Sequence, residues 1–573
     1  MIKLETSVLR PLRAVLRKHP AIYYGTLVIA VVAIWSAIFG RVPGTEAFHV
    51  PVEYRGDALF LAGVLRGFSE FPAPWNLHIG HLNAPFGADW NDYPHSEKLL
   101  FYLGGALVRL FDSGVAVNLL LLFAFVFNAV GFCWTARRFG AGPLRAMAGA
   151  TMFAFSSFAL FRSVPHLVLV YVGHIPLILY LCRRLQHVGS NRRGLWIWGS
   201  VCIVVSAFLN PYYFVFALLL IALVSLRLVV QRRMRDVLIS AVLLAEGLVV
   251  FVVNQSNVLI YRRLHGESPL IHQRLLPEQI RWGLRLPDLF MPLEHPLRAW
   301  ANYAKQNYFV PEFVSENLAA FLGLVGCVGL AAIIIVSLLQ GMRRRIERVP
   351  YEMWIILLVY IFCSPGGGAL LMAVSGFSWL RATNRYSIVI LCAVLLWLGR
   401  VCRFRCAPML GGVVCVALTA FTVWESSKAL PMERRLSPAA LVKADRSFVQ
   451  ELERQLPQGA AVFQVPVMAF PESPPIVNLL DYDPFRPYLW SKTLRFSYGT
   501  HKGRPREIWQ AQCARKPARE MVGELAAKGF SAILVQRSGF ADRGRALEAA
   551  LSNAGLSRIA GGADTEMVSY RLQ

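Results

Sequence analysis

Long apolar segments alternate with short polar ones along most of the chain. With a window of about twenty residues, the length of helix that crosses a bilayer, the pattern predicts eleven membrane spans. The chain therefore reads as a polytopic helical membrane protein up to about residue 424. The predicted spans lie near residues 21–40, 116–136, 144–161, 167–184, 194–209, 212–228, 236–254, 317–340, 351–372, 385–400 and 407–424.

One further apolar segment, residues 98–112, is short for a span, and we expect a re-entrant or interfacial helix there. If it does not cross, five basic loops fall on the side of the N-terminus, which is then predicted to be cytoplasmic. If it does cross, the sides of all later loops are exchanged. The five loops comprise residues 136–142, 182–194, 226–236, 341–350 and 399–406.

The last part of the chain has a different pattern. Apolar runs typical of strands, at 460–470 and 531–537, alternate with helical patterns at 515–528 and 541–554. Such alternation is typical of an α/β domain. We expect a transmembrane domain of residues 1–424 with large outer loops at 41–97 and 255–316, and a soluble extracytoplasmic α/β domain of residues 425–573.

Composition and charge agree with a membrane protein. Of the 573 residues, 56% are hydrophobic and only 16% are charged, which excludes an ordinary soluble enzyme. The formal net charge of +25 would suggest nucleic acid in a soluble protein. Here most basic clusters lie between apolar segments, where they anchor the chain to anionic membrane lipids. No nucleic-acid partner is expected.

The first outer loop, residues 41–97, begins with the principal catalytic candidate. Asp57 follows Glu53 by four residues, close to the first span. A carboxylate near a membrane surface, with aromatic groups around it, can acquire a pKa suited to base catalysis. Asp57 would equally suit the cap of the helical pattern at 58–67, so a structural role stays open.

Later in the same loop, oxygen and imidazole groups follow one another closely. Such groups could hold a divalent cation. Their spacing matches no closed metal site, and residues 83–90 read equally well as a turn-rich loop that lines a sugar site. The metal therefore stays unknown and no cofactor is certain. The groups are His78, His81, Asp89, Asp92 and His95.

Arg381 and Arg385 precede the predicted span 385–400 on the outer face. Four residues apart, they would point the same way on one helical turn. Two guanidinium groups presented together suit a phosphate or pyrophosphate. Anchoring to lipid headgroups uses the same chemistry and is the alternative.

Further polar groups lie at predicted outer positions and are candidates for substrate binding. Ionisable groups at the ends of spans usually face a cavity or a partner. The segment 481–509 is rich in aromatic and basic residues, which suit stacking on sugars or packing against the membrane part. These candidates are His166, Glu294, His295, Tyr482 and Arg486.

Four short motifs carry a resemblance to a known class. They are GDALF (56–60), APWN with NAPFG (73–87), PDLFMPLEHP (287–296) and RATNRYS (381–387). With a first span, an acidic outer loop, many spans and a C-terminal outer domain, the chain resembles the GT-C class of membrane glycosyltransferases. More narrowly, it looks like bacterial members described as YfhO-like.

The resemblance implies transfer of a sugar from a polyprenyl-phosphate donor to an envelope glycan or lipid acceptor, at the outer face of the bacterial cytoplasmic membrane. An acid of the first outer loop would be the general base, and Asp57 has the matching position. Arg381 and Arg385 would steady the departing phosphate, with inversion at the anomeric carbon. Many members have an adjacent acidic pair where Glu53 and Asp57 are four apart, which leaves the choice of base and any metal open.

Two other functions remain open at this point. A transporter or flippase for lipid-linked sugars would also be basic and multispanning, although transporters often show internal repeats and broken helices at the bilayer midplane. A non-catalytic assembly protein of an envelope polysaccharide complex is the second.

Overall fold

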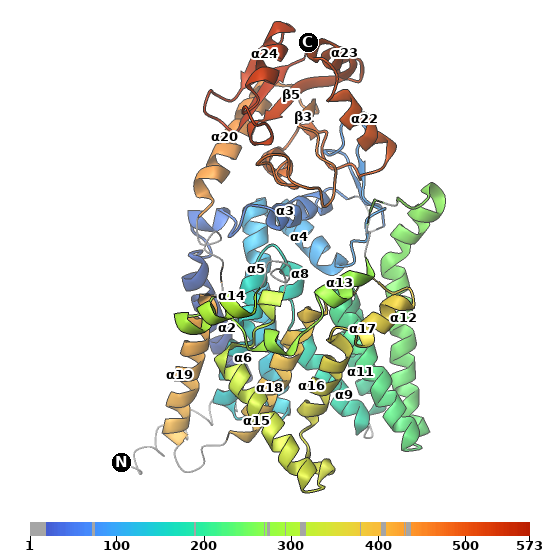
Figure 1. Ribbon diagram of the computed structural model, residues 1–573, viewed down its shortest axis with the longest axis vertical. Helices are drawn as coiled ribbons and strands as arrows, with labels where there is room; N and C mark the ends of the chain where they lie inside the picture. The colour runs from blue at the N-terminus through green and yellow to red at the C-terminus, as the bar shows by residue number, and fades with distance from the viewer. Residues whose placement is uncertain are drawn as a thin grey trace.

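The computed structural model describes residues 19–71, 75–187, 191–268, 270–271, 275–292, 294–309, 317–378, 380–402, 408–428, 430 and 437–572. An elongated helical bundle carries a smaller region, built around a β-sheet, at one end (Figure 1). The turn between α15 and α16 lies at the opposite end.

Nine helical segments of the described chain are long and apolar enough to cross a membrane. A tenth is a broken helix in which α16 (Tyr351–Cys363) and α17 (Gly368–Val374) meet at 40°. The nine are α2 (Pro20–Phe39), α5 (Ser113–Arg138), α6 (Pro143–Ala154) with α7 (Ser157–Arg162), α10 (Arg192–Leu209), α11 (Pro211–Val230), α12 (Met234–His265), α15 (Gly323–Met342), η6 (Thr383–Tyr386) with α18 (Ser387–Val401), and α19 (Pro408–Ser427).

The predicted span 167–184 is wrong, because the chain breaks there into α8 (Leu167–Val170) and α9 (His174–Gln186). A side chain of α5 satisfies the backbone at the break: Asn128 donates to the carbonyl of Val170 and accepts from the amide of Val172. Irregular backbone inside a bundle persists where other protein groups satisfy its hydrogen bonds.

The segment 98–112 forms α4 (Lys98–Leu110), which is not among the candidate spans of the described chain. It packs on α3 (Asp57–Phe68) near the sheet end of the bundle (Figure 1). The contact requires glycine, since a Cβ on Gly105 would lie 2.6 Å from the carbonyl carbon of Phe68. Small residues allow two helix backbones to approach this closely.

The basic loops meet at the end of the bundle opposite the sheet. Arg183, Arg227 and Arg400, from three of the loops, line one cavity together with residues of a fourth. Arg145, next to the remaining loop, donates a hydrogen bond to the carbonyl of Cys402. The structure thus gathers these loops as expected from the sequence, while the assignment of that end to the cytoplasm stays a prediction.

The C-terminal region contains the mixed α/β structure that its sequence predicts. The central strand β3 (Ala461–Val465) is parallel to β4 (Arg495–Phe496) and β5 (Phe530–Gln536). It is shorter than the apolar run 460–470 because Pro466 has no N–H to donate. The sheet order is β4-β3-β5-β7-β6, and β7 (Met567–Arg571) pairs antiparallel with β5 and β6 (Arg558–Ala560). Its helices are α20 (Ala439–Gln455), α21 (Phe485–Trp490), α22 (Pro505–Cys513), α23 (Ala518–Ala527) and α24 (Arg545–Asn553).

Most of the remaining short elements lie in the outer loops predicted from the sequence. They are η1 (Glu46–His49), β1 (His78–Ile79), β2 (Ala88–Asp89), α13 (Leu276–Arg281), η2 (Leu286–Leu289) and α14 (Arg298–Asn307). The others are η4 (Asn317–Ala320) just before α15, η5 (Ile346–Arg348) between α15 and α16, and η8 (Arg537–Gly539) after β5.

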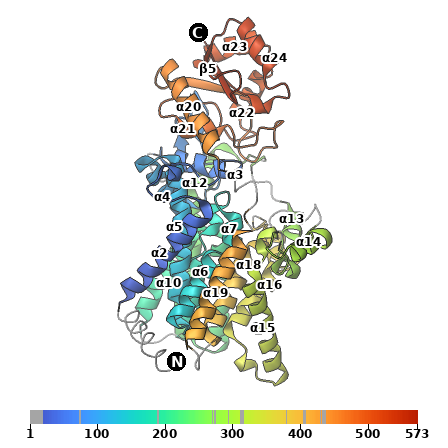
Figure 2. The same ribbon diagram turned by 90° about the vertical axis from the view of Figure 1, so that its left-hand side faces the viewer.

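A buried polar network joins the first loop to the C-terminal region; we call it the junction. Asp445 of α20 accepts two hydrogen bonds from the guanidinium of Arg486, at 2.8 and 2.6 Å, and one from the hydroxyl of Tyr54. The indole of Trp490 donates to the Tyr54 oxygen at 2.7 Å. Figure 2 shows α20 and α21 next to α3 and α4. The network fixes the chain three residues before α3 begins.

We predict that Asp445→Asn loosens the junction. The substitution leaves the buried Arg486 without its carboxylate, and the loss of one partner of a buried ion pair costs about 3–5 kcal/mol. Thermal unfolding of the purified protein in detergent should therefore begin at a lower temperature, and proteolysis between bundle and sheet should be faster. Arg543→Gln breaks an exposed ion pair with Glu566 and is the control. Equal stability of the two variants would contradict the assigned role of the junction.

Candidate functional site

The candidate site is centred on the first residue of α3. Gly56 precedes the helix with φ of +51°, a conformation that glycine adopts without strain. Asp57 is the first helical residue, and its side chain is 50% exposed. A carboxylate in the first turn is stabilised by the helix dipole. Asp57 Oδ2 lies 3.7 Å from Nε2 of His166, which comes from the chain just before α8.

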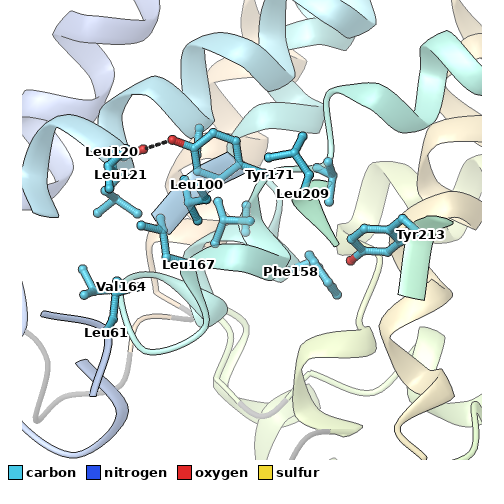
Figure 3. Close-up of a cluster of buried hydrophobic side chains, with 14 of the residues drawn as sticks. Leu61, Leu100, Leu120, Leu121, Phe158, Val164, Leu167, Tyr171, Leu209 and Tyr213 are labelled. Atoms are coloured by element: carbon cyan, nitrogen blue, oxygen red, sulfur yellow. Dashed lines mark hydrogen bonds between the residues drawn. The ribbon is translucent and has the colours of Figure 1, made fainter. Parts of the chain in front are cut away.

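Side chains close to Asp57 and to His166 in the chain belong to one apolar cluster, which Figure 3 shows. It includes Leu61 of α3, together with Val164 and Leu167, which flank His166 in the sequence; all three are buried. Tyr171 joins the same cluster and donates a hydrogen bond to the carbonyl of Leu120 at 2.7 Å. Because Asp57 and His166 rest on a common close-packed core, their relative position is well defined.

The C-terminal region contributes a second acid to this site. The pKa of Asp481 is raised to about 7, first by burial and then by the negative charge of Asp57. Tyr482, the next residue, packs its ring 5.0 Å from that of Phe60 in the first turn of α3. Two carboxyl groups within electrostatic reach of each other favour retention of a proton, so the pair can hold and exchange one near neutral pH.

A second polar group gathers around Arg385 of η6. Its guanidinium lies 4.6 Å from the ring centroid of Tyr212, at the start of α11. Its charge lowers the pKa of Glu97, which burial raises more strongly, to a net value of about 7. The neighbouring Lys98 is hydrogen-bonded to Asn257 at 2.7 Å, and burial lowers the pKa of its amine to about 8. The segments just before α4 and just before α18 therefore bring the acid of Glu97 near the positive charge of Arg385, beside the start of α11.

Arg381 has different partners. It forms an ion pair with Glu278 at 3.1 Å, and its guanidinium lies 4.7 Å from the ring of Trp282. The helix η6 begins only at Thr383. The expectation that Arg381 and Arg385 point the same way from one helical turn is therefore wrong.

The acids and histidines of the first loop do not converge. His78 and Asp89 are paired across β1 and β2, while His81 lies 2.9 Å from Glu70. Asp92 is fully buried and accepts two hydrogen bonds from Arg504 of the C-terminal region. In the described parts of the chain, no group of three or more His, Cys, Asp or Glu side chains could hold a metal ion. That these side chains bind substrate stays a prediction.

The remaining predicted candidates also have structural partners. Glu294 forms an exposed ion pair with Lys305, and His295 a buried hydrogen bond with Glu425, each at 2.6 Å. Arg486 belongs to the junction. Glu53 lies immediately before the junction residue Tyr54 and is partly buried. The structure thus brings Asp57, His166 and Tyr482 together, and it leaves these others outside that group.

Sequence reasoning missed two acids, Glu97 near Arg385 and Asp481 near Asp57. Glu97 is the last residue of the predicted first loop and directly precedes an apolar helix. An acid at such a boundary could have been singled out by its position. Asp481 begins a segment that is rich in aromatic residues, and nothing in the sequence indicates that it approaches Asp57.

Comparison with known proteins extends only to the fold. No protein-family model and no curated protein matches the chain. The solved structure of the arabinofuranosyltransferase AftD from Mycobacteria matches with a TM-score of 0.53 at 16% identity. The match covers 96% of this chain and 40% of AftD, so the chain spans less than half of that protein. A mutant of AftD gives a TM-score of 0.54 at 15% identity, covering 96% of this chain and 41% of the other.

The oligosaccharyltransferase AglB from Archaeoglobus fulgidus is also matched, at 10% identity over 90% of this chain and 70% of AglB, but its TM-score of 0.37 is too low to support an argument. At these identities, similarity shows the fold alone. The chain has a polytopic, GT-C-like fold with a C-terminal mixed-sheet region.

We predict that Glu97→Gln changes how stability depends on pH. The pKa of Glu97 is about 7 in the folded chain and 4.5 in the absence of structure, so between these values the folded state binds more protons than the unfolded state. Stability therefore falls as pH rises through this window. The variant, which is neutral throughout, should lose that contribution and melt at a higher temperature than the wild type at pH 8.

The comparison is made by thermal unfolding from pH 5 to pH 8, with the exposed Glu294→Gln as control, which should follow the wild type. If the melting temperature of Glu97→Gln depends on pH as that of the wild type does, the inference that burial raises the pKa of Glu97 is wrong.

Proposed function

We propose that the protein is a membrane glycosyltransferase that moves a sugar, a hexose or a pentose, from a polyprenyl-phosphate donor to an envelope glycan or lipid acceptor. The observation that supports this most is the position of Asp57. Its half-exposed carboxylate begins a helix at the end of a membrane bundle, beside His166 and under the C-terminal region. The GT-C-like fold, matched by an arabinofuranosyltransferase, supports the same reading.

In the proposed reaction, the acceptor hydroxyl lies at the Asp57 carboxylate, which takes its proton as the oxygen bonds to the anomeric carbon. The bond from that carbon to the phosphate oxygen breaks, and both electrons leave with the lipid phosphate. Attack opposite to the leaving group inverts the anomeric carbon. A general base of this kind contributes about 10²–10⁴-fold to the rate. His166, whose Nε2 lies 3.7 Å from the Asp57 carboxylate, would orient it.

Arg385 is the proposed partner of the departing phosphate. Arg385 lies in η6, directly before α18, and a guanidinium suits the three oxygens of a phosphate. Arg381 would act indirectly, since its ion pair with Glu278 joins α13 to the chain just before η6. Glu53 and Asp481 would assist through the charge around Asp57.

The same proposal includes an arrangement in the membrane. Residues 1–424 form the transmembrane domain, residues 425–573 the extracytoplasmic domain, and the N-terminus is cytoplasmic. The membrane is the bacterial cytoplasmic membrane. Gathering of the basic loops at the end opposite the candidate site supports this orientation.

We predict that Asp57→Asn removes one glycan decoration from the cell envelope. The amide keeps the size of the side chain but cannot accept the proton, so transfer should fall by about 10²-fold or more. Envelope glycans are analysed in a deletion strain that carries wild-type or variant protein, with the amount of protein in the membrane measured in parallel. Asp564→Asn, in an exposed loop between β6 and β7, is the matched control and should restore the decoration. Normal glycans with Asp57→Asn, beside a clear defect on deletion, would point to transport or assembly instead.

We predict that substitutions of Arg381 and Arg385 have different effects in the same glycan assay. Arg385→Gln removes the charge proposed to stabilise the leaving phosphate, and we expect a loss of product at unchanged protein level, with partial recovery in Arg385→Lys. Arg381→Gln should lower the melting temperature, through loss of the ion pair with Glu278, with a smaller effect on product. If Arg381→Gln removes product and Arg385→Gln does not, the proposed phosphate partner is wrong.

A further inference from the structure

A polar cavity of about 500 Å³ lies at the end of the bundle opposite the candidate site. Its walls come from four helices and the loop between α15 and α16. Arg183 comes from α9, Arg227 from α11 and Arg400 from α18, while Glu352 and Trp354 come from the start of α16. Nothing in the proposed transfer reaction uses this cavity.

The charges in the cavity are unequal. Arg400 forms an ion pair with the buried Glu352 at 2.7 Å, and the two charges offset each other. Arg183 lies 4.6 Å from the ring centroid of Phe139, and Arg227 donates a hydrogen bond to the amide oxygen of Gln186 at 3.0 Å. Within the part of the chain that the structure describes, neither Arg183 nor Arg227 forms an ion pair with a carboxylate.

The remaining lining groups do not cancel this charge. Glu347 lies in the exposed loop between α15 and α16, where solvent screens it, and His187 is exposed on the other side. Arg183 and Arg227 lie on neighbouring helices and line the same cavity. Two guanidinium groups without a carboxylate partner in the described chain are suited to a phosphate group. The cavity therefore has a net positive interior that an anion would neutralise.

The surroundings indicate that the anion is attached to a lipid. Trp354 is 50% exposed beside the cavity, and half-exposed indole rings are typical of the membrane–water interface. The neighbouring α11 and α16 also expose apolar side chains, among them Leu226 at 60% and Leu357 at 37%. Basic pockets between membrane helices bind lipid headgroups on the side where basic loops gather.

We propose that this cavity binds the phosphate-bearing headgroup of an anionic phospholipid, on the face opposite the sugar-transfer site. Arg183 and Arg227 bind the phosphate, Trp354 packs at the level of the headgroup, and the acyl chains extend along α11 and α16. The inference does not depend on the proposed transfer activity, because it uses none of the residues of that site.

Native mass spectrometry of the detergent-purified protein with added phosphatidylglycerol tests the proposal, with phosphatidylcholine as the zwitterionic comparison. The wild type should retain phosphatidylglycerol preferentially, and Arg183→Gln/Arg227→Gln should bind it at least tenfold more weakly. Arg343→Gln/Arg345→Gln removes the same charge from the exposed basic loop without lining the cavity, and should bind as the wild type does. If all three proteins bind phosphatidylglycerol equally, the proposal is wrong.

Two further measurements, with a lysine variant and with a soluble phosphate compound, complete the test. Arg183→Lys/Arg227→Lys retains the charge without the forked donors and should bind with intermediate strength; it carries the test if the glutamine pair does not fold. Inorganic pyrophosphate is the soluble probe of the same chemistry. Stabilisation of the wild type by pyrophosphate, lost in the glutamine pair and unmatched by phosphatidylglycerol, would replace the lipid headgroup with a soluble phosphate ligand and overturn the lipid assignment.

Discussion

The site depends on the hydrogen bonds that the buried carboxylate of Asp445 accepts. This carboxylate satisfies the guanidinium of Arg486 and the hydroxyl of Tyr54 at the same time, and so links the C-terminal region to the first loop. A buried charge with a missing partner is costly, which makes this geometry difficult to change. Because Tyr54 is three residues from Asp57, the junction also determines where α3 begins and which way its first carboxylate faces.

Close contacts at two glycines complete the support. A Cβ on Gly63 would lie 2.7 Å from the ring of Phe485, so α3 packs directly on α21. A Cβ on Gly105 would likewise lie too close to the backbone of Phe68, so α4 packs directly on α3. The helix that carries Asp57 is therefore held between the membrane bundle and the C-terminal sheet, and both contribute to the charge around it. Burial raises the pKa of Asp481, and the negative charge of Asp57 across this contact raises it further.

The sequence predicted most of the fold because bilayer-length apolar runs and alternating strands have strong patterns. It failed at 167–184, where the side chain of Asn128 satisfies a broken backbone that hydropathy treats as one continuous helix. For the site, position alone pointed to Asp57 and to His166. The partners of Arg381 and Asp92 lie about 100 and 400 residues away in the chain, respectively. Contacts at such separation follow from the packing of whole elements, which residue spacing cannot reveal.

In the proposed transfer, the bond between a sugar and a lipid phosphate breaks. The most direct measurement incubates purified protein with envelope membranes from a deletion strain, supplies polyprenyl-phosphate sugars, and follows the release of free polyprenyl phosphate. We expect release in step with labelling of an envelope acceptor, in the presence of the wild type only. Intact lipid-linked sugar that changes sides of the membrane, with no polyprenyl phosphate released, would contradict it.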